Sequence, residues 1–261
     1  MRELKKPTIV IIMRTVSRGP DGFGSQMLTL FLGYLNALRD EEGFCYTQIG
    51  SIQLAVVGTS NQELIEMQSV VDTTMENLGV PVCSGEIHPI THISFQDNYS
   101  SVSSDTFNRG YLDALSNAWP LESPYDGDKF NITIHLRRGG DISGATANRW
   151  TPSEYYNELI PKLLNAYPKA LIHVVSWGDP QLDLLTPDTS RVKYYSDNTI
   201  LTHYNMLVHA DMCFIASSTF SASAALFNKN KVLLDPALMK LETCPTSQLW
   251  ITNFDREKNL W

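Results

Sequence analysis

The sequence predicts an α/β fold with parallel sheets, because short apolar runs alternate with segments of helical periodicity. Residues 7–13 form a continuous run rich in β-branched side chains, as in a strand buried on both faces of a parallel sheet. After residue 130, apolar runs and helical segments follow one another several times, which indicates βαβ units.

In the first half, a glycine-rich turn follows the first strand. Apolar residues then recur at helical spacing from Ser25, which we expect to be the N-cap of a helix. A second helix is predicted to stop at Gly79 and Pro81. The other elements expected here are a strand at 52–57, the second helix at 62–78, a strand region at 86–95 and a helix at 104–119.

In the second half, the strongest helix start has Thr151 as the cap, Pro152 at the first position and Glu154 closing a capping box. We expect strands at 130–136, 171–176, 192–195, 212–216 and 232–234, and helices at 152–167, 180–185, 200–209 and 220–228. Residues 120–128 contain two prolines and a glycine among polar residues. This segment is the predicted boundary between an N-terminal half, residues 1–120, and a C-terminal half, residues 129–261.

Composition limits the classes of partner. The 261 residues are 43% hydrophobic, which suffices for packed cores, and the net charge is -8. Such an acidic chain repels nucleic acid and anionic lipid, so an anionic ligand must be held by a local cationic cluster. The apolar stretch near the N-terminus is too short to span a membrane. We therefore expect a soluble, cytoplasmic protein that binds no nucleic acid.

The sequence contains no strong pattern for a metal site or for a set of disulfides. Asp126 and Asp128 resemble an Asp-x-Asp metal site, but they precede a strand in a proline-containing loop, so we expect a solvated turn and no metal. The four cysteines form no Cys-x-x-Cys pair, which argues against zinc and against a disulfide scaffold. We expect inert buried thiols. They are Cys45, Cys83, Cys213 and Cys244.

Two arginines and a histidine close the predicted strand at 130–136, and two glycines follow them. Guanidinium groups bind diphosphates in a bidentate manner, and glycines let a ligand approach the backbone. Ligands of open α/β sheets bind at the carboxyl ends of the strands. The segment 135–141, with His135, Arg137 and Arg138, is therefore a candidate diphosphate receptor.

The turn before Ser25 is open to two interpretations. Its glycines fit the spacing of a phosphate-binding loop but lack the lysine, and Met27 stands where a dinucleotide fingerprint has its third glycine. The turn is either a tight connection without a ligand or a set of backbone N–H groups at a helix start that binds one. Residues 217–221 follow the strand at 212–216, and their hydroxyls either bind phosphate oxygens or cap the next helix.

Taken together, residues 22–27, 135–141 and 217–221 resemble the motif set of the fucosyltransferases that make α1,2, α1,6 and protein O-fucose linkages, and the bacterial α1,2 type above all. The resemblance spans residues 20 to about 235. It implies a GT-B-like architecture of two Rossmann-like halves, with parallel sheets facing across a cleft, the first half on the acceptor side and the second on the donor side. It also implies inverting, metal-independent transfer from GDP-fucose to a glycan hydroxyl, without a cofactor.

The resemblance gives roles to several residues. Arg137 grips the β-phosphate, with Arg138 and His135 in support. The loop that faces the donor from the first half is implied to include Gly22, Gly24 and Gln26. The hydroxyl residues that complete the phosphate grip are implied to be Ser218, Thr219 and Ser221.

The catalytic assignments rest on position along the chain. Arg137 stabilises charge on the departing diphosphate, and Asp21 and Asp141 are the candidate general bases. Asp179, at another predicted strand end, is a candidate nucleoside contact. Departures from the family pattern, such as Ser25 in the glycine motif, leave two alternatives open. One is the same fold with another donor such as UDP-xylose, and the other is an inactive protein that binds nucleotide sugars or glycans.

Overall fold

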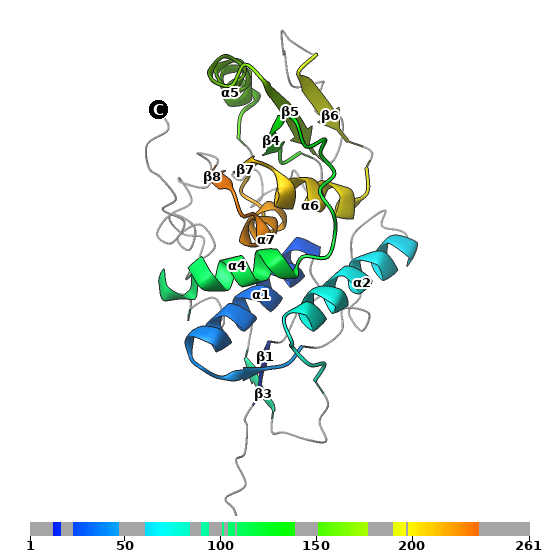
Figure 1. The fold of residues 1–261 in the computed structure, drawn as a ribbon, viewed down its shortest axis with the longest axis vertical. Helices are drawn as coiled ribbons and strands as arrows, with labels where there is room; N and C mark the ends of the chain where they lie inside the picture. The colour runs from blue at the N-terminus through cyan, green and yellow to red at the C-terminus, as the bar shows by residue number, and fades with distance from the viewer. Residues whose placement is uncertain are drawn as a thin grey trace, which may run out of the picture.

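The computed structural model describes the chain in segments that cover most of both halves (Figure 1). The described residues are 13–16, 23–46, 61–83, 90–93, 101, 104–107, 109–138, 151–176, 190–196 and 198–234. The predictions for a strand at 52–57 and a helix at 180–185 lie outside these residues.

A small parallel sheet lies in the first half. Its order is β2-β1-β3, with β1 (Met13–Val16) pairing in parallel with both β2 (Gly43–Phe44) and β3 (Ile90–Ile93). The described part of the first strand begins at the last residue of the predicted run, 7–13. β2 was not predicted, because two residues are too short for a periodic signal.

A larger parallel sheet in the second half has the order β6-β5-β4-β7-β8. All five strands fall where the sequence predicts them, and the α/β class with parallel sheets is confirmed. The strands are β4 (Phe130–His135), β5 (Ala170–Val175), β6 (Val192–Tyr195), β7 (Met212–Ile215) and β8 (Lys231–Leu234).

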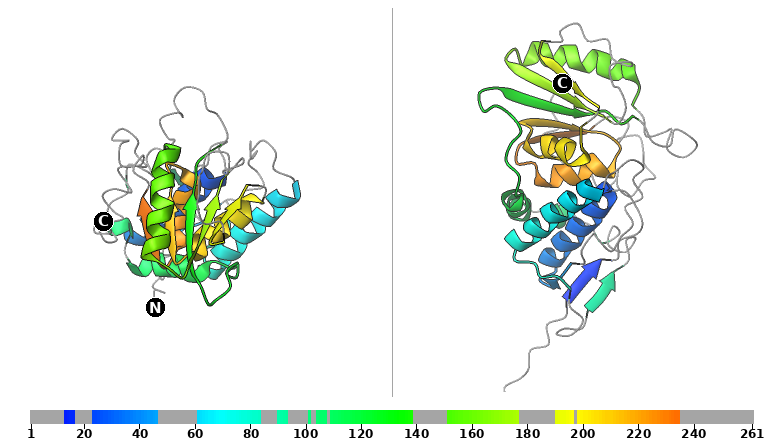
Figure 2. Two further views of the ribbon diagram at one scale, coloured as in Figure 1. Left: turned by 90° about the horizontal axis from the view of Figure 1, so that it is seen from above. Right: turned by 90° about the vertical axis from the view of Figure 1, so that its right-hand side faces the viewer.

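Helices cover both faces of the larger sheet (Figure 2). The helix α5 (Ser153–Ala166) packs on one face, where it shares a core with Ile132 and Ile134 of β4. Alternate residues of a strand point to opposite faces. Thr133 accordingly faces α6 (Ile200–His209), which lies on the other face together with α7 (Thr219–Phe227).

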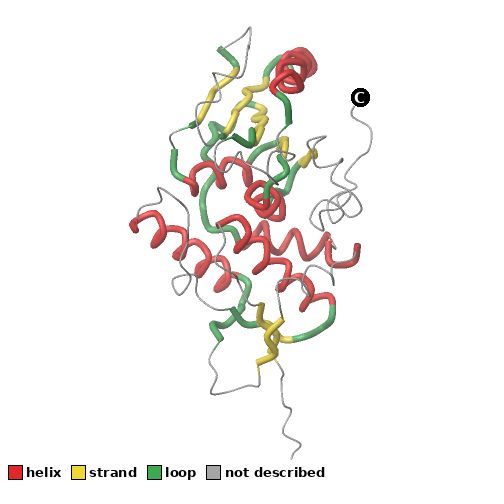
Figure 3. Tube along the Cα trace, turned by 180° about the vertical axis from the view of Figure 1, so that it is seen from behind, coloured by secondary structure: helices red, strands yellow, loops and turns green. Residues whose placement is uncertain are grey.

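The helix α1 (Phe23–Arg39) is buried on all sides over residues 23–37. It packs against the small sheet on one side and against α7 on the other, so its sequence is apolar around most of its circumference. Figure 3 shows the central helices between the two groups of strands. In the described residues, helices from both halves lie between the two sheets. The resemblance implies a cleft between the halves, and that cleft stays a prediction.

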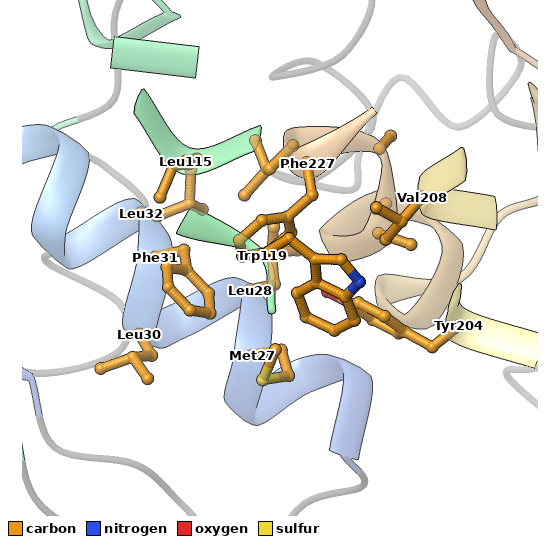
Figure 4. Close-up of a cluster of buried hydrophobic side chains, with 14 of the residues drawn as sticks. Met27, Leu28, Leu30, Phe31, Leu32, Leu115, Trp119, Tyr204, Val208 and Phe227 are labelled. Atoms are coloured by element: carbon orange, nitrogen blue, oxygen red, sulfur yellow. The ribbon is translucent and has the colours of Figure 1, made fainter. Parts of the chain in front are cut away.

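One hydrophobic core joins the halves (Figure 4). Trp119 lies against the rings of Tyr204 and Phe227, with centroid distances of 5.3 and 5.0 Å, and Phe31 of α1 meets Phe227 edge to face at 4.6 Å. The indole N–H of Trp119 donates to Asn205 Oδ1 at 2.8 Å. The hydrophobic core therefore continues across the predicted boundary at 120–128. The division of the chain into two domains stays a proposal.

The helices α2 (Asn61–Asn77) and α4 (Arg109–Ala118) complete the central block. α2 matches the predicted 62–78, whereas the predicted helix 104–119 is divided into a 3-10 turn, Ser104–Phe107, and α4. Glu63 of α2 accepts a hydrogen bond from the backbone N–H of Ile200 at 2.6 Å. A carboxylate at the N-terminus of α6 is favourable because that end carries partial positive charge.

Two predicted caps are wrong. α1 begins at Phe23, so Ser25 lies inside its first turn and is not the N-cap. The N-cap of α5 is Pro152, with no side-chain cap hydrogen bond, so Thr151 forms no capping box. The backbone oxygen of Thr151 instead accepts from Arg138 at 3.3 Å, a contact that local sequence does not reveal.

The expectation of free thiols is wrong for two cysteines. Cys45 and Cys83 form a disulfide, with Cα atoms 5.0 Å apart. A parallel bridge between Tyr46 and Val82 brings them together across 38 positions, which spacing along the chain could not show. Cys213 is free and buried, as expected, and Cys244 lies outside the described residues.

In the part of the chain that the structure describes, no helix is both long and apolar enough to cross a bilayer.

Replacing Cys45 and Cys83 together by alanine should lower the free energy of unfolding by about 3–4 kcal/mol, because the bridge closes a loop of 38 positions. Urea denaturation measures this loss. Dithiothreitol should destabilise the wild type by a similar amount and leave the double variant unchanged. A wild-type midpoint that does not move on reduction would contradict the prediction.

Candidate functional site

The candidate site lies where β4 and β7 end side by side. From β4 the chain leads to α5 on one face of the sheet, and from β7 it leads to α7 on the other face. Such a reversal is a topological switch point, and ligands of open α/β sheets bind outside the strand ends there. His135 is the last residue of β4, and residues 217–218 connect β7 to α7, so two of the predicted motifs meet at this point.

The third motif reaches the same place from the first half. A Cβ atom on Gly24 would lie 2.3 Å from the Cα and 2.4 Å from the backbone N of Phe220. Only glycine fits at this approach. The ring of Phe220 in turn lies 5.5 Å from the ring of His135. The structure therefore brings Gly24, His135 and the start of α7 into one cluster.

Two helix N-termini adjoin in this cluster. Gly24 is the second residue of α1 and Phe220 is the second residue of α7, so the first turns of the two helices are in contact. The first turn of a helix has unpaired N–H groups and partial positive charge. Two such ends beside Arg137, which follows the end of β4, make a local positive field in an acidic chain.

The two arginines after β4 differ in their surroundings. Arg138 donates to the backbone oxygens of Arg137 and Thr151 at 3.0 and 3.3 Å and to Ser153 Oγ at 2.9 Å. Its guanidinium also lies 6.0 Å from the centre of the Tyr156 ring. Arg138 thus connects the end of β4 to the start of α5, and its supporting role at a donor stays a prediction. Arg137 is half-buried, and its charge contributes to the low pKa of His135.

The hydroxyl motif is used largely within its own turn. Ser218 is the N-cap of α7 and accepts from the N–H of Phe220 at 3.3 Å. Ser221 is fully buried and donates to the backbone oxygens of Ala216 and Ser218. Thr219, the first residue of α7, is partly exposed. The capping interpretation therefore describes Ser218, while a phosphate contact for these three residues stays a prediction.

Two imidazoles lie in the cluster. Burial, with smaller effects of the Arg137 and His203 charges, lowers the pKa of His135 to about 3. Burial also lowers the pKa of His203, on α6, to about 4. Both imidazoles are therefore neutral near pH 7 and each offers one N–H donor and one acceptor.

From the sequence, we assigned no functional role to the aromatic residues or to His203. Phe220 meets Tyr204 at 5.5 Å, and Tyr204 meets Phe23 at 5.4 Å, so three rings from three helices frame the cluster. Their positions in apolar helical segments give only a core signal. His203 on a predicted helix was interpreted as structural, and no local pattern distinguishes it from other buried histidines.

Several predicted site residues are not located. Gly22, Asp21, Asp141 and Asp179 lie outside the described residues, so their roles remain predictions. Gln26 is described and is 1% exposed in the first turns of α1. A donor contact through its side chain stays a prediction as well.

The described segments contain no group of three or more His, Cys, Asp or Glu side chains that could hold a metal ion. Asp126 and Asp128 lie in an exposed turn, as predicted.

Comparison with known proteins gives no match to a family model and none to a curated sequence. Among solved structures, the iron-containing dodecameric glycosyltransferase TibC from enterotoxigenic E. coli matches with a TM-score of 0.47 and 9% identity, over 87% of this chain and 59% of TibC. Arabidopsis thaliana FUT1, a variant in complex with GDP, matches with a TM-score of 0.46 and 11% identity, over 88% and 71%. E. coli heptosyltransferase WaaC with ADP matches with a TM-score of 0.45 and 13% identity, over 87% and 89%.

The chain thus spans about three-fifths of TibC, and 62% of it in a second TibC structure with ADP-D-beta-D-heptose. At these TM-scores and identities the similarities carry no assignment of activity.

Gly24→Ala should lower the free energy of unfolding by about 1–3 kcal/mol, because the methyl group would overlap the backbone of Phe220 and push α1 away from α7. Thermal and urea denaturation test this. Gly127→Ala is the matched control, since nothing lies within 4 Å of its added Cβ. Equal stability of the two variants would show that the close approach does not exist.

Stability should fall as the pH decreases from about 6.5, because the buried imidazoles resist protonation while those of the unfolded chain accept it. Burial, with a smaller effect of Lys193, lowers the pKa of His173 to about 4. His173→Gln should therefore reduce the slope of unfolding free energy between pH 5 and 6.5 by about 1 kcal/mol per pH unit. Urea denaturation at several pH values measures the slope. An unchanged slope would mean that folding does not lower the pKa of His173.

Proposed function

We propose that this chain is an inverting glycosyltransferase that moves a sugar from a nucleotide-sugar donor to a glycan hydroxyl. One observation carries the proposal: the first turns of α1 and α7 meet at the switch point of the larger sheet, beside the strand end that carries His135 and Arg137. Backbone N–H groups, helix N-termini and a guanidinium together suit a diphosphate.

The same arrangement suits the chemistry of the transfer. When the bond between the anomeric carbon and the diphosphate breaks, negative charge grows on the departing phosphate oxygens. Fixed positive groups at that position stabilise the transition state more than the ground state. We propose that Arg137 and the two helix ends supply this positive charge, so that the reaction needs no metal ion.

For the donor, we propose GDP-fucose as the first candidate, on the basis of the resemblance in residues 22–27, 135–141 and 217–221. UDP-xylose or another nucleotide sugar is the alternative, because the motifs depart from the family pattern in several places. Asp21 and Asp141 remain the proposed general bases and Asp179 the proposed nucleoside contact.

The halves have distinct proposed roles. The switch point belongs to the larger sheet, so residues 129–261 form the donor side, and residues 1–120 contribute the start of α1 and the acceptor side. The acceptor we propose is a glycan.

The cellular location is also a proposal. The sequence favoured the cytoplasm, but disulfides are rare in cytosolic proteins. The Cys45–Cys83 disulfide supports an oxidising compartment instead.

Arg137→Ala should weaken the binding of the matching nucleoside diphosphate by about 10- to 100-fold, because a charge-assisted contact contributes about 1.5–3 kcal/mol. Calorimetric titration of GDP, UDP and ADP into the wild type identifies the base and supplies the reference affinity. Arg109→Ala is the control, since Arg109 lies on α4 with a side chain that is 73% exposed and pairs with Asp113.

The same proteins are then assayed for sugar transfer with excess chelator. Chelator-sensitive transfer would exclude the metal-independent mechanism, and full activity of Arg137→Ala would exclude the role of this arginine. Tight binding without transfer or donor hydrolysis, across a panel of glycan acceptors, would favour an inactive nucleotide-sugar-binding protein.

A further inference from the structure

Two imidazole nitrogens in the cluster are buried without a hydrogen-bond partner. They are Nδ1 of His135 and Nε2 of His203, and no described residue supplies a donor or acceptor to either. His203 as a whole is only 5% exposed. A buried polar atom without a partner destabilises the folded chain. Folded proteins contain few such atoms, so two in one place need an explanation.

The other two histidines with described side chains are different. His173 has both ring nitrogens paired, Nε2 with Asn131 Oδ1 at 3.0 Å and Nδ1 with the Tyr195 hydroxyl at 3.1 Å. His209 donates from Nε2 to the backbone oxygen of Leu121 at 2.8 Å. His173 and His209 thus have partners inside the fold, whereas Nδ1 of His135 and Nε2 of His203 do not.

The position of His203 places it in the proposed donor site. It lies in the first half of α6, and in a parallel sheet the helix that follows a strand begins at the carboxyl edge. His203 is close enough to His135 for its charge to affect that imidazole. The neighbouring residue, Tyr204, packs against Phe220, which also contacts His135.

We propose that His203 is a further donor-site residue that, together with His135, hydrogen-bonds hydroxyl groups of the transferred sugar. The inference rests on the proposed function. The unpaired nitrogen of each neutral imidazole is a donor or an acceptor according to the tautomer, and a sugar hydroxyl pairs with either because it both donates and accepts. The phosphates need positive charge, which Arg137 and the helix ends supply. A buried group built to bind a hydroxyl also disfavours ligands that lack it, because it would then stay unpaired.

The test compares each nucleoside diphosphate with its sugar conjugate. We expect His203→Phe to bind the diphosphate like the wild type but to bind the nucleotide sugar about 10-fold more weakly, the loss of one hydrogen bond. GDP with GDP-fucose and UDP with UDP-xylose are the probe pairs, measured by calorimetry. The His203→Gln variant, which keeps a donor and an acceptor, should recover part of the loss and serves as a second measurement if His203→Phe does not fold.

The melting temperature without ligand distinguishes a binding role of His203 from a structural role. His203→Phe removes a nitrogen that has no partner, so its melting temperature should equal or exceed that of the wild type. The matched control is His173→Phe, which breaks two hydrogen bonds and should melt at a lower temperature.

Two results would overturn the inference. One is equal loss of affinity for diphosphate and sugar conjugate, and the other is no loss for either. A wild type that binds no diphosphate at all would instead reject the proposed function itself.

Discussion

The close approach of α1 to α7 at Gly24 is the constraint on which the rest of the structure depends. It fixes the first turn of a helix from the first half against the first turn of a helix from the second half. The same contact buries α1 between the small sheet and α7 and places two helix N-termini at the carboxyl ends of β4 and β7. A side chain at this position would therefore disturb the shared core and the site together.

This constraint explains why the halves behave as one packed unit although each has its own sheet. The segment 120–128, with its prolines and glycine, is the predicted boundary, yet contacts before it and within it attach it to the core. Trp119 enters the core before it, and the Tyr125 hydroxyl donates to the backbone oxygen of Met206 within it. Asn205 also donates to the backbone oxygen of Glu122. Separating the halves would expose the apolar surface of α1 and α7, so the site has a rigid support.

The sequence predicted what depends on local periodicity and missed what depends on contacts between distant residues. β6 and α6 were found at their observed limits because apolar spacing is a local signal. The disulfide between Cys45 and Cys83 arises from a parallel bridge across 38 positions. The same limit applies to the site: motif order indicated that three segments converge, but the unpaired nitrogen of His203 becomes visible only when α6 is placed beside β4.

The site separates charge from neutral hydrogen bonding, and this separation follows from the fold. Arg138 is engaged with the start of α5, so the two arginines of the motif are not equivalent. In a chain of net charge -8, Arg137 and two helix ends supply the positive charge of the proposed donor site. The imidazoles beside them stay neutral because burial and the Arg137 charge make protonation costly. Under the proposed function, charge would thus act where a leaving diphosphate gains it, and the neutral imidazoles would recognise a neutral group of the ligand.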